Sequence, residues 1–133
     1  MLPNGLLNGA VPIVPYTNPR AAIRWLEQAF GATAVLVVPP ETDQPLAHAE
    51  VAIGTGLVMI DDAERDSPFA LPGPGVVYVV VEDPDALHAH ASAAGAEIIM
   101  PLTDQDYGSR EFAARDPYGN VWSFGTYRPS LGG

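Results

Sequence analysis

Cysteine and lysine are both absent from this chain of 133 residues. Without cysteine, the chain can form neither disulfides nor thiolate metal sites. No apolar run approaches the roughly 20 residues of a membrane-spanning helix. No basic segment followed by an apolar stretch indicates a signal peptide. We therefore expect a protein that does not enter a membrane, with the cytoplasm as its default location.

Positive charge is also scarce. Six arginines face sixteen aspartates and glutamates, which gives a formal net charge of −10. Such a surface repels the phosphate backbone of nucleic acids and attracts cationic small molecules, although acidity also simply keeps a protein soluble. Hydrophobic residues make up 47% of the chain, which is typical of a globular protein with a core. At this length we expect one domain, residues 1–133.

The segment 108–127 combines a strong turn signal with alternating apolar residues. The sequence DPYGN at its centre predicts a tight turn, because proline presets φ and glycine tolerates a positive φ. Beyond the turn, Trp122 and Phe124 alternate with the small residues Ser123 and Gly125. Successive side chains of a strand point to opposite faces. We expect the bulky face to join the core and the small face to line an open space.

The order strand, helix, strand, hairpin occurs twice, about 64 residues apart. Asn18-Pro19 and Asp83-Pro84 predict the two helix starts, because Asn and Asp are good N-caps and proline fits the first helical position. Gly31 and Gly95 predict the two helix ends.

The repeat predicts an α+β fold made of two tandem βαβββ modules. Module 1 spans about residues 9–61, and module 2 spans about residues 76–128, with a connector at 62–75 and loops at 39–46 and 101–108. One module alone cannot bury its sheet, so we expect the two to form a curved mixed sheet, a cup with the helices outside.

The duplicated βαβββ order, the sequence RDPYGNVW at 115–122 and the helix entry at 16–19 resemble the vicinal-oxygen-chelate superfamily. This superfamily contains glyoxalase I, extradiol dioxygenases, fosfomycin-resistance enzymes and bleomycin-resistance binding proteins. The resemblance covers residues 9–128. It is closest in type to the metal-free antibiotic-binding members, and it implies a homodimer.

Catalytic members of that superfamily hold a metal ion with His, Gln or Glu from the first and last strands of each module. Transferred one at a time, these positions fall on Val11, Val76, a place near Met59, and Ser123. None of them supplies the imidazole or carboxylate that a divalent ion needs. The resemblance therefore implies a site with no metal and no other cofactor.

Strand alternation divides the hairpin 47–61 into two faces. One face is wholly apolar and should pack on a helix; it carries Ala49, Val51, Ile53, Val58 and Ile60. The other face is mixed and should line the cavity; it carries His48, Glu50, Ala52, Leu57, Met59 and Asp61. His48 and Glu50 can form a metal pair, an acid–base pair or a polar hydrogen-bonding patch. We favour the patch, because two ligands do not make a metal site.

The second half contributes fewer polar candidates. Tyr78 and Val80 share a face of the strand 76–82, and either Arg110 or Glu111 must point inward. Tyr107 and Phe69 lie in loops at the mouth of the cup. The full set of expected ligand-binding residues is Ile13, His48, Glu50, Met59, Asp61, Phe69, Tyr78, Val80, Tyr107, Glu111 and Ser123. No nucleophile constellation appears, so we assign no catalytic residue.

Two classes of function are compatible with these patterns. The first is a metal-independent binding protein that sequesters a cationic or aromatic antibiotic or secondary metabolite, with carboxylates to orient a cation and apolar walls to supply affinity. The alternative is a glyoxalase- or dioxygenase-like lyase or isomerase with an atypical metal or general-base site at His48 and Glu50.

Overall fold

The computed structural model describes residues 11–64 and 75–129. Module 1 contains β1 (Ile13–Tyr16), α1 (Pro19–Phe30), β2 (Thr33–Val38), β3 (His48–Ile53) and β4 (Gly56–Asp62). Module 2 contains β5 (Val76–Val80), α2 (Pro84–Ala93), β6 (Glu97–Asp104), β7 (Arg110–Arg115) and β8 (Val121–Gly125). The predicted α+β architecture of two βαβββ modules is confirmed.

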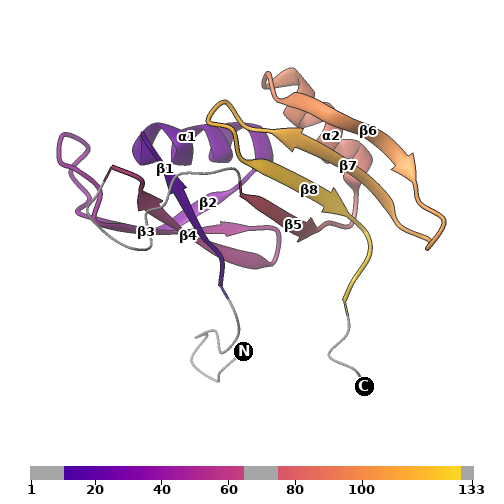
Figure 1. Ribbon diagram of the computed structural model, residues 1–133, viewed down its shortest axis with the longest axis horizontal. Coiled ribbons are helices and arrows are strands. Elements are labelled where there is room, and N and C mark those ends of the chain that lie inside the picture. Colours follow the sequence, from indigo (N-terminus) through magenta and orange to yellow (C-terminus); the bar gives the residue numbers. More distant parts are fainter. Residues whose placement is uncertain (1–10, 65–74, 130–133) are drawn as a thin grey trace.

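The eight strands are divided between two four-stranded sheets, with the orders β1-β4-β3-β2 and β5-β8-β7-β6. Both sheets are mixed: β1 runs parallel to β4 and β5 runs parallel to β8, whereas the other pairs are antiparallel. Figure 1 shows the two sheets side by side, with α1 along the upper side of module 1 and α2 against β6 and β7 of module 2. Each sheet therefore has one face turned toward the helices and one face free of them, which we call its open face.

Both helices begin where the sequence predicts. The side chain of Asn18 accepts a hydrogen bond from the backbone N–H of Ala21 at 3.4 Å, and Asp83 does the same for Ala86 at 3.0 Å. Gly31 ends α1 with a φ of 70°, a left-handed conformation that glycine adopts without steric cost. Within the described ranges, neither helix is long and apolar enough to cross a bilayer.

One core serves both modules. Phe30, at the end of α1, contacts the rings of Trp122 and Phe124 in β8, with centroids 5.8 and 4.9 Å apart. Phe112 of β7 stacks on Phe124 at 5.1 Å. All four side chains are buried. The helix of module 1 thus packs on the sheet of module 2, and the core lies between the helices and the helix-facing sides of the sheets.

Strand registers confirm the predicted division of the hairpin 47–61 into two faces. Glu50 lies opposite Met59, and Val51 lies opposite Val58. Val51 and Val58 are buried, and Glu50 and Met59 lie on the open face. The helix-facing set is buried throughout, as a sheet face under a helix must be.

The prediction of a loop over residues 101–108 is wrong for its first half. Strand β6 continues to Asp104, which pairs with Arg110, and Thr103 pairs with Glu111. Pro101 is tolerated because, among the described strands, β6 is an edge strand that pairs with β7 alone. The pairing of β6 with β7 also shifts register between Met100 and Thr103. This irregularity accommodates Pro101, which has no backbone N–H to donate to the neighbouring strand.

A buried carboxylate joins the two modules. Asp116 lies in the turn after β7, and its Oδ2 accepts hydrogen bonds from Tyr16 Oη at 2.7 Å and Trp122 Nε1 at 3.1 Å. Its Oδ1 accepts from the backbone N–H groups of Tyr118 and Asn120, both at 3.0 Å. Burial, followed by the charge of Asp116, raises the pKa of Tyr16 far above its usual range. The turn of module 2 is thereby fixed to β1 of module 1.

Candidate binding site on the open face of module 2

The open face of module 1 carries the predicted polar pair. His48 Nε2 lies 2.8 Å from Glu50 Oε2, and both side chains are partly exposed. Ile13 and Glu50 flank Met59 on the neighbouring strands. Asp61 is only 8% exposed, and its Oδ1 accepts a hydrogen bond from the backbone N–H of the next residue at 2.9 Å. This face offers an acid–base pair on an open surface beside apolar side chains.

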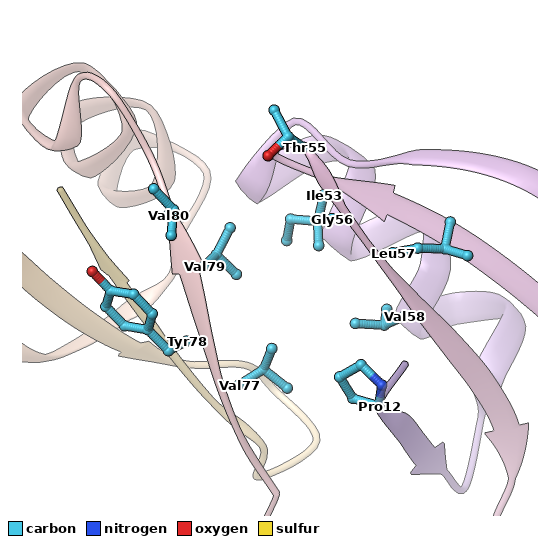
Figure 2. Close-up of a pocket in the computed structure, with 10 residues that line it drawn as sticks. All are labelled: Pro12, Ile53, Thr55, Gly56, Leu57, Val58, Val77, Tyr78, Val79 and Val80. Carbon is cyan, nitrogen blue, oxygen red and sulfur yellow. The ribbon is translucent and has the colours of Figure 1, made fainter. Parts of the chain in front are cut away.

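A cavity of about 250 Å³ lies in the seam between the two sheets (Figure 2). Its walls come from β3, β4 and the turn between them, from β5 and from the residue before β1: Pro12, Ile53, Thr55, Gly56, Leu57, Val58, Val77, Tyr78, Val79 and Val80. Figure 2 shows Val77 and Val79 pointing into the seam, whereas the ring of Tyr78 points to the other side of β5. The described lining residues include no charged side chain, so this cavity offers volume but nothing to orient a charged ligand.

The ring of Tyr78 instead belongs to a cavity of about 520 Å³ on the open face of module 2. This cavity, the tyrosine cavity, is lined by Tyr78, Tyr107, Glu111, Tyr127 and Pro129. Its volume lies within the roughly 300–1,000 Å³ that is usual for small-molecule sites. It combines three aromatic rings with one carboxylate.

The register of β7 places Glu111 in this cavity. Glu111 lies opposite Gly125 of β8 and is 7% exposed. Its neighbour Arg110 points the other way, and its guanidinium binds Asp85 at 2.7 Å and Asp104 at 3.0 Å. The sequence left open whether Arg110 or Glu111 points inward. In the structure, Glu111 lies on the open face.

Hydrogen bonds hold the tyrosines around Glu111. Tyr107 Oη donates to Glu111 Oε1 at 2.8 Å, and Tyr78 Oη donates to the carbonyl oxygen of Tyr127, also at 2.8 Å. The rings of Tyr107 and Tyr127 meet edge to face at 6.0 Å. Burial raises the pKa of Tyr78, and the hydrogen bond to Glu111 raises the pKa of Tyr107. Both phenols thus keep their protons at neutral pH.

Gly125 makes this arrangement possible. A Cβ atom at this position would lie 2.6 Å from Glu111 Cγ and 2.7 Å from Tyr78 Oη. Both distances are shorter than van der Waals contact, so any larger residue would displace one of the two side chains. The small face that the sequence predicted for β8 is the space that Glu111 and Tyr78 occupy.

Comparison with known proteins places the chain in a family. The profile of the glyoxalase/bleomycin resistance protein/dioxygenase superfamily matches residues 10–124. The chain belongs to this superfamily. A protein of Mycobacterium bovis is 34% identical to it over 113 residues, which cover 79% of this chain and 74% of that protein.

Two solved structures extend this relationship. TioX from Micromonospora sp. ML1 superimposes with a TM-score of 0.78 at 30% identity, covering 93% of this chain and 99% of TioX. A glyoxalase/bleomycin resistance protein from Catenulispora acidiphila superimposes with a TM-score of 0.62 at 26% identity, covering 87% of this chain and 95% of that one. The two-module arrangement is thus the fold of the glyoxalase/bleomycin resistance superfamily.

The positions at which the superfamily resemblance implies metal ligands do not fit a metal here. Met59 and Ser123 lie on the open faces of β4 and β8, and the first-strand positions are Val11 and Val76. None of the four carries an imidazole or a carboxylate, which a divalent ion requires. Within residues 11–64 and 75–129, no three His, Asp or Glu side chains are grouped to hold an ion.

The structure divides the predicted ligand-binding residues between the two sheets. Tyr78, Tyr107 and Glu111 come together in the tyrosine cavity, Ser123 lies on the same open face, and Val80 lines the seam. The remaining described candidates lie on the open face of module 1: Ile13, His48, Glu50, Met59 and Asp61. Phe69 lies outside the described residues.

Sequence reasoning missed Tyr127 and Pro129 as lining residues. A signal for Tyr127 was present: it follows Ser123 and Gly125 at intervals of two, which in an extended chain places the three on one face. The predicted strand–turn–strand segment 108–127 includes Tyr127, but of its small face only Ser123 was named as a candidate.

Proposed function

We propose that this chain is a metal-independent binding protein of the cytoplasm that sequesters an antibiotic or secondary metabolite, in the manner of a resistance or self-resistance protein. The observation that carries this proposal is the tyrosine cavity, whose described lining residues include one carboxylate, that of Glu111. The bound ligand is cationic or aromatic, because those are the groups that the cavity can recognise.

The chemistry of the cavity supports this class of ligand. Aromatic rings offer large contact areas for other rings, and a carboxylate orients a cation within apolar walls. The net charge of −10 adds a long-range attraction for cations. Membership in a superfamily named partly for bleomycin resistance proteins supports a role in drug binding.

A homodimer is part of this proposal. The open face of module 1 exposes three aliphatic side chains, Ile13, Leu36 and Val38, which are 45%, 43% and 42% exposed. A second copy packed on this face would remove them from water. Light scattering coupled to gel filtration should give twice the mass of the chain, and a monomer at micromolar concentration would contradict this part.

Elemental analysis and ligand screening on one preparation test the function. The protein is incubated with Zn, Fe, Ni and Mn salts and then desalted. We expect less than about a tenth of an equivalent of retained metal, because the described part of the chain groups no three His, Asp or Glu side chains that could hold an ion. In a thermal-shift screen, cationic or aromatic antibiotics such as bleomycin should raise the melting temperature equally with and without EDTA. Near-stoichiometric metal, or binding that EDTA abolishes, would contradict the proposal.

The contact between His48 and Glu50 favours a second candidate, a lyase or isomerase that uses this pair as a general base. The two atoms lie 2.8 Å apart, which is the distance of a working acid–base pair. Mass spectrometry of the bound compound distinguishes the two functions. Sequestration returns the compound unchanged, whereas an enzyme converts it, and Glu50→Gln would then abolish the conversion.

A further inference from the structure

We propose that Tyr78, Tyr107, Tyr127 and Glu111 form a cage for an organic ammonium group, with quaternary or alkylated amines as the preferred class. This inference rests on the proposed binding function and names the chemical group that the site selects.

The three rings approach the cavity from separate parts of module 2. Tyr78 comes from β5, Tyr107 from the turn before β7, and Tyr127 from the segment after β8. The ring planes of Tyr107 and Tyr127 are 83° apart, so these two rings offer a compact group two nearly perpendicular surfaces, whereas a single ring offers only one. The cavity, at about 520 Å³, also leaves room for the part of the ligand that carries the ammonium group.

Two of the three tyrosines already use their hydroxyl protons. Tyr107 donates its proton to Glu111, and Tyr78 donates its proton to the carbonyl of Tyr127. What these two residues still offer a ligand is a hydroxyl oxygen that can accept a hydrogen bond and a ring face that carries the negative part of the aromatic quadrupole. Ring faces bind cations without a hydrogen bond, so a methylated ammonium group suits them better than a sugar or an amide does.

Glu111 adds a negative charge, and no ion pair within residues 11–64 and 75–129 neutralises it. It is the single charged residue among the described residues that line the cavity. Its Oε1 accepts from Tyr107, and the described part of the chain gives Oε2 no hydrogen-bond donor. Arg110, the neighbouring cation, is committed to Asp85 and Asp104. A buried carboxylate with a neutral donor and no cation is stabilised when a ligand supplies the positive charge.

Choline and its neutral carbon isostere 3,3-dimethylbutan-1-ol test the cage, because the two molecules differ in charge and hardly in shape. Calorimetric titration of the wild-type protein should show saturable binding of choline and at least about tenfold weaker binding of the isostere. Glu111→Gln should weaken choline binding about tenfold. Glu82→Gln is the matched control, because Glu82 lies in module 2 at the surface, 3.9 Å from Arg128, and its loss changes the net charge equally. Glu82→Gln should leave choline binding unchanged.

A second pair of variants separates the ring from its hydroxyl group. Tyr107→Phe keeps the ring and should change choline affinity less than about threefold, whereas Tyr107→Ala removes it and should weaken binding about tenfold. Tyr107 is exposed, so both variants should fold even if Glu111→Gln does not, and circular dichroism checks each one.

Equal binding of choline and its isostere, or equal affinities of Glu111→Gln and Glu82→Gln, would overturn the cage. Titration with bleomycin separates this failure from failure of the proposed function. Wild-type protein that binds bleomycin without metal but shows no choline binding would overturn the cage and leave the binding function standing. Binding of neither compound, together with stoichiometric metal, would overturn both.

Discussion

The two modules repeat one backbone but differ in the chemistry of their open faces. Ile13 of β1 pairs with Met59 of β4, and at the equivalent place Tyr78 of β5 pairs with Ser123 of β8. Module 1 therefore presents aliphatic and thioether side chains where module 2 presents a phenol beside a small hydroxyl. The repeat fixes where side chains point, and the residue types decide what each face can bind.

The next pair along the strands shows why the tyrosine cavity forms in module 2. Asp61 lies opposite Pro15 in module 1, and Gly125 lies opposite Val80 in module 2. Asp61 has a side chain at its position in β4, whereas Gly125 has none at the equivalent position in β8. Glu111 reaches into the space that this absence leaves. A small residue in one module thus gives room to functional groups from its neighbours.

The hairpin turns differ in the same way. In module 1, Gly54-Thr55-Gly56 connects β3 to β4, and Thr55 is exposed. In module 2, the turn between β7 and β8 contains Asp116, whose buried carboxylate receives four hydrogen bonds. We infer that the second turn stabilises the fold and the first merely connects two strands.

Removal of Asp116 should have the largest effect on stability. Asp116→Ala leaves Tyr16, Trp122 and two backbone N–H groups without their buried acceptor, and we expect a loss of about 3–5 kcal/mol in the free energy of unfolding. Thr55→Ala in the other turn is the matched control and should change it by less than about 0.5 kcal/mol. Urea denaturation gives both values. Similar losses in the two variants would remove the contrast between the turns.

Tyr16→Phe should cost about 1.5–3 kcal/mol, because it deletes one hydrogen bond to a charged group and leaves Asp116 its other donors. It should also change the response to alkali. Because the pKa of Tyr16 is raised in the folded state, its contribution to stability is complete below the unfolded pKa of about 10 and is lost as pH rises further. The wild type should therefore lose stability above pH 10 more steeply than the variant in denaturation series at several pH values. If the free energy of unfolding fell equally steeply with pH in both proteins, Tyr16 would not have a raised pKa in the folded state.

Gly125→Ala should cost about 1–3 kcal/mol through overpacking, because the new methyl group collides with Glu111 and Tyr78. It should also weaken choline binding, since either side chain must leave the cavity. Asp61→Ala at the equivalent position of module 1 should leave choline binding unchanged. Calorimetry on both variants measures this difference, and loss of binding in Asp61→Ala alone would reverse the roles of the two modules.

Asp85→Asn should have the smallest effect. The hydrogen bond from Arg110 lowers the pKa of Asp85, so this carboxylate stabilises the fold at pH values above about 4 and the contribution is lost as pH falls through the lowered pKa. The pair is exposed, and solvent screening keeps its contribution small. Melting temperatures from pH 7 to pH 3 should show a slight difference between wild type and variant that disappears on acidification. A difference in melting temperature that grows below pH 4 would contradict a stabilising role for the ionised Asp85.

Periodicity and turn chemistry predicted much of the fold. The helix starts at Asn18 and Asp83, the two faces of the hairpin 47–61, and the bulky and small faces of β8 followed from local rules, because each depends on residues close together in the sequence. The exception was β6, which was predicted to end at Met100 although an edge strand tolerates the Pro101 that follows.

The site could be predicted only in part, because it depends on contacts between distant segments. Glu111 and Gly125 meet through a strand register that the sequence does not encode locally. Asp116 was interpreted as a turn residue, since its partner Tyr16 lies 100 positions away. Tyr127 lies beyond the last strand, and contacts with Tyr78, Tyr107 and Ser109, which are distant in the sequence, hold it at the cavity.

A nitrogen-15 NMR titration of metal-stripped protein with choline tests the central contrast between the modules most directly. We predict that the largest shift changes occur at Tyr78, Tyr107, Glu111 and Tyr127, with little change at His48, Glu50 and Asp61. Shift changes confined to those last three residues, or shifts that appear only after a divalent metal is added, would contradict the account of a metal-independent site in module 2.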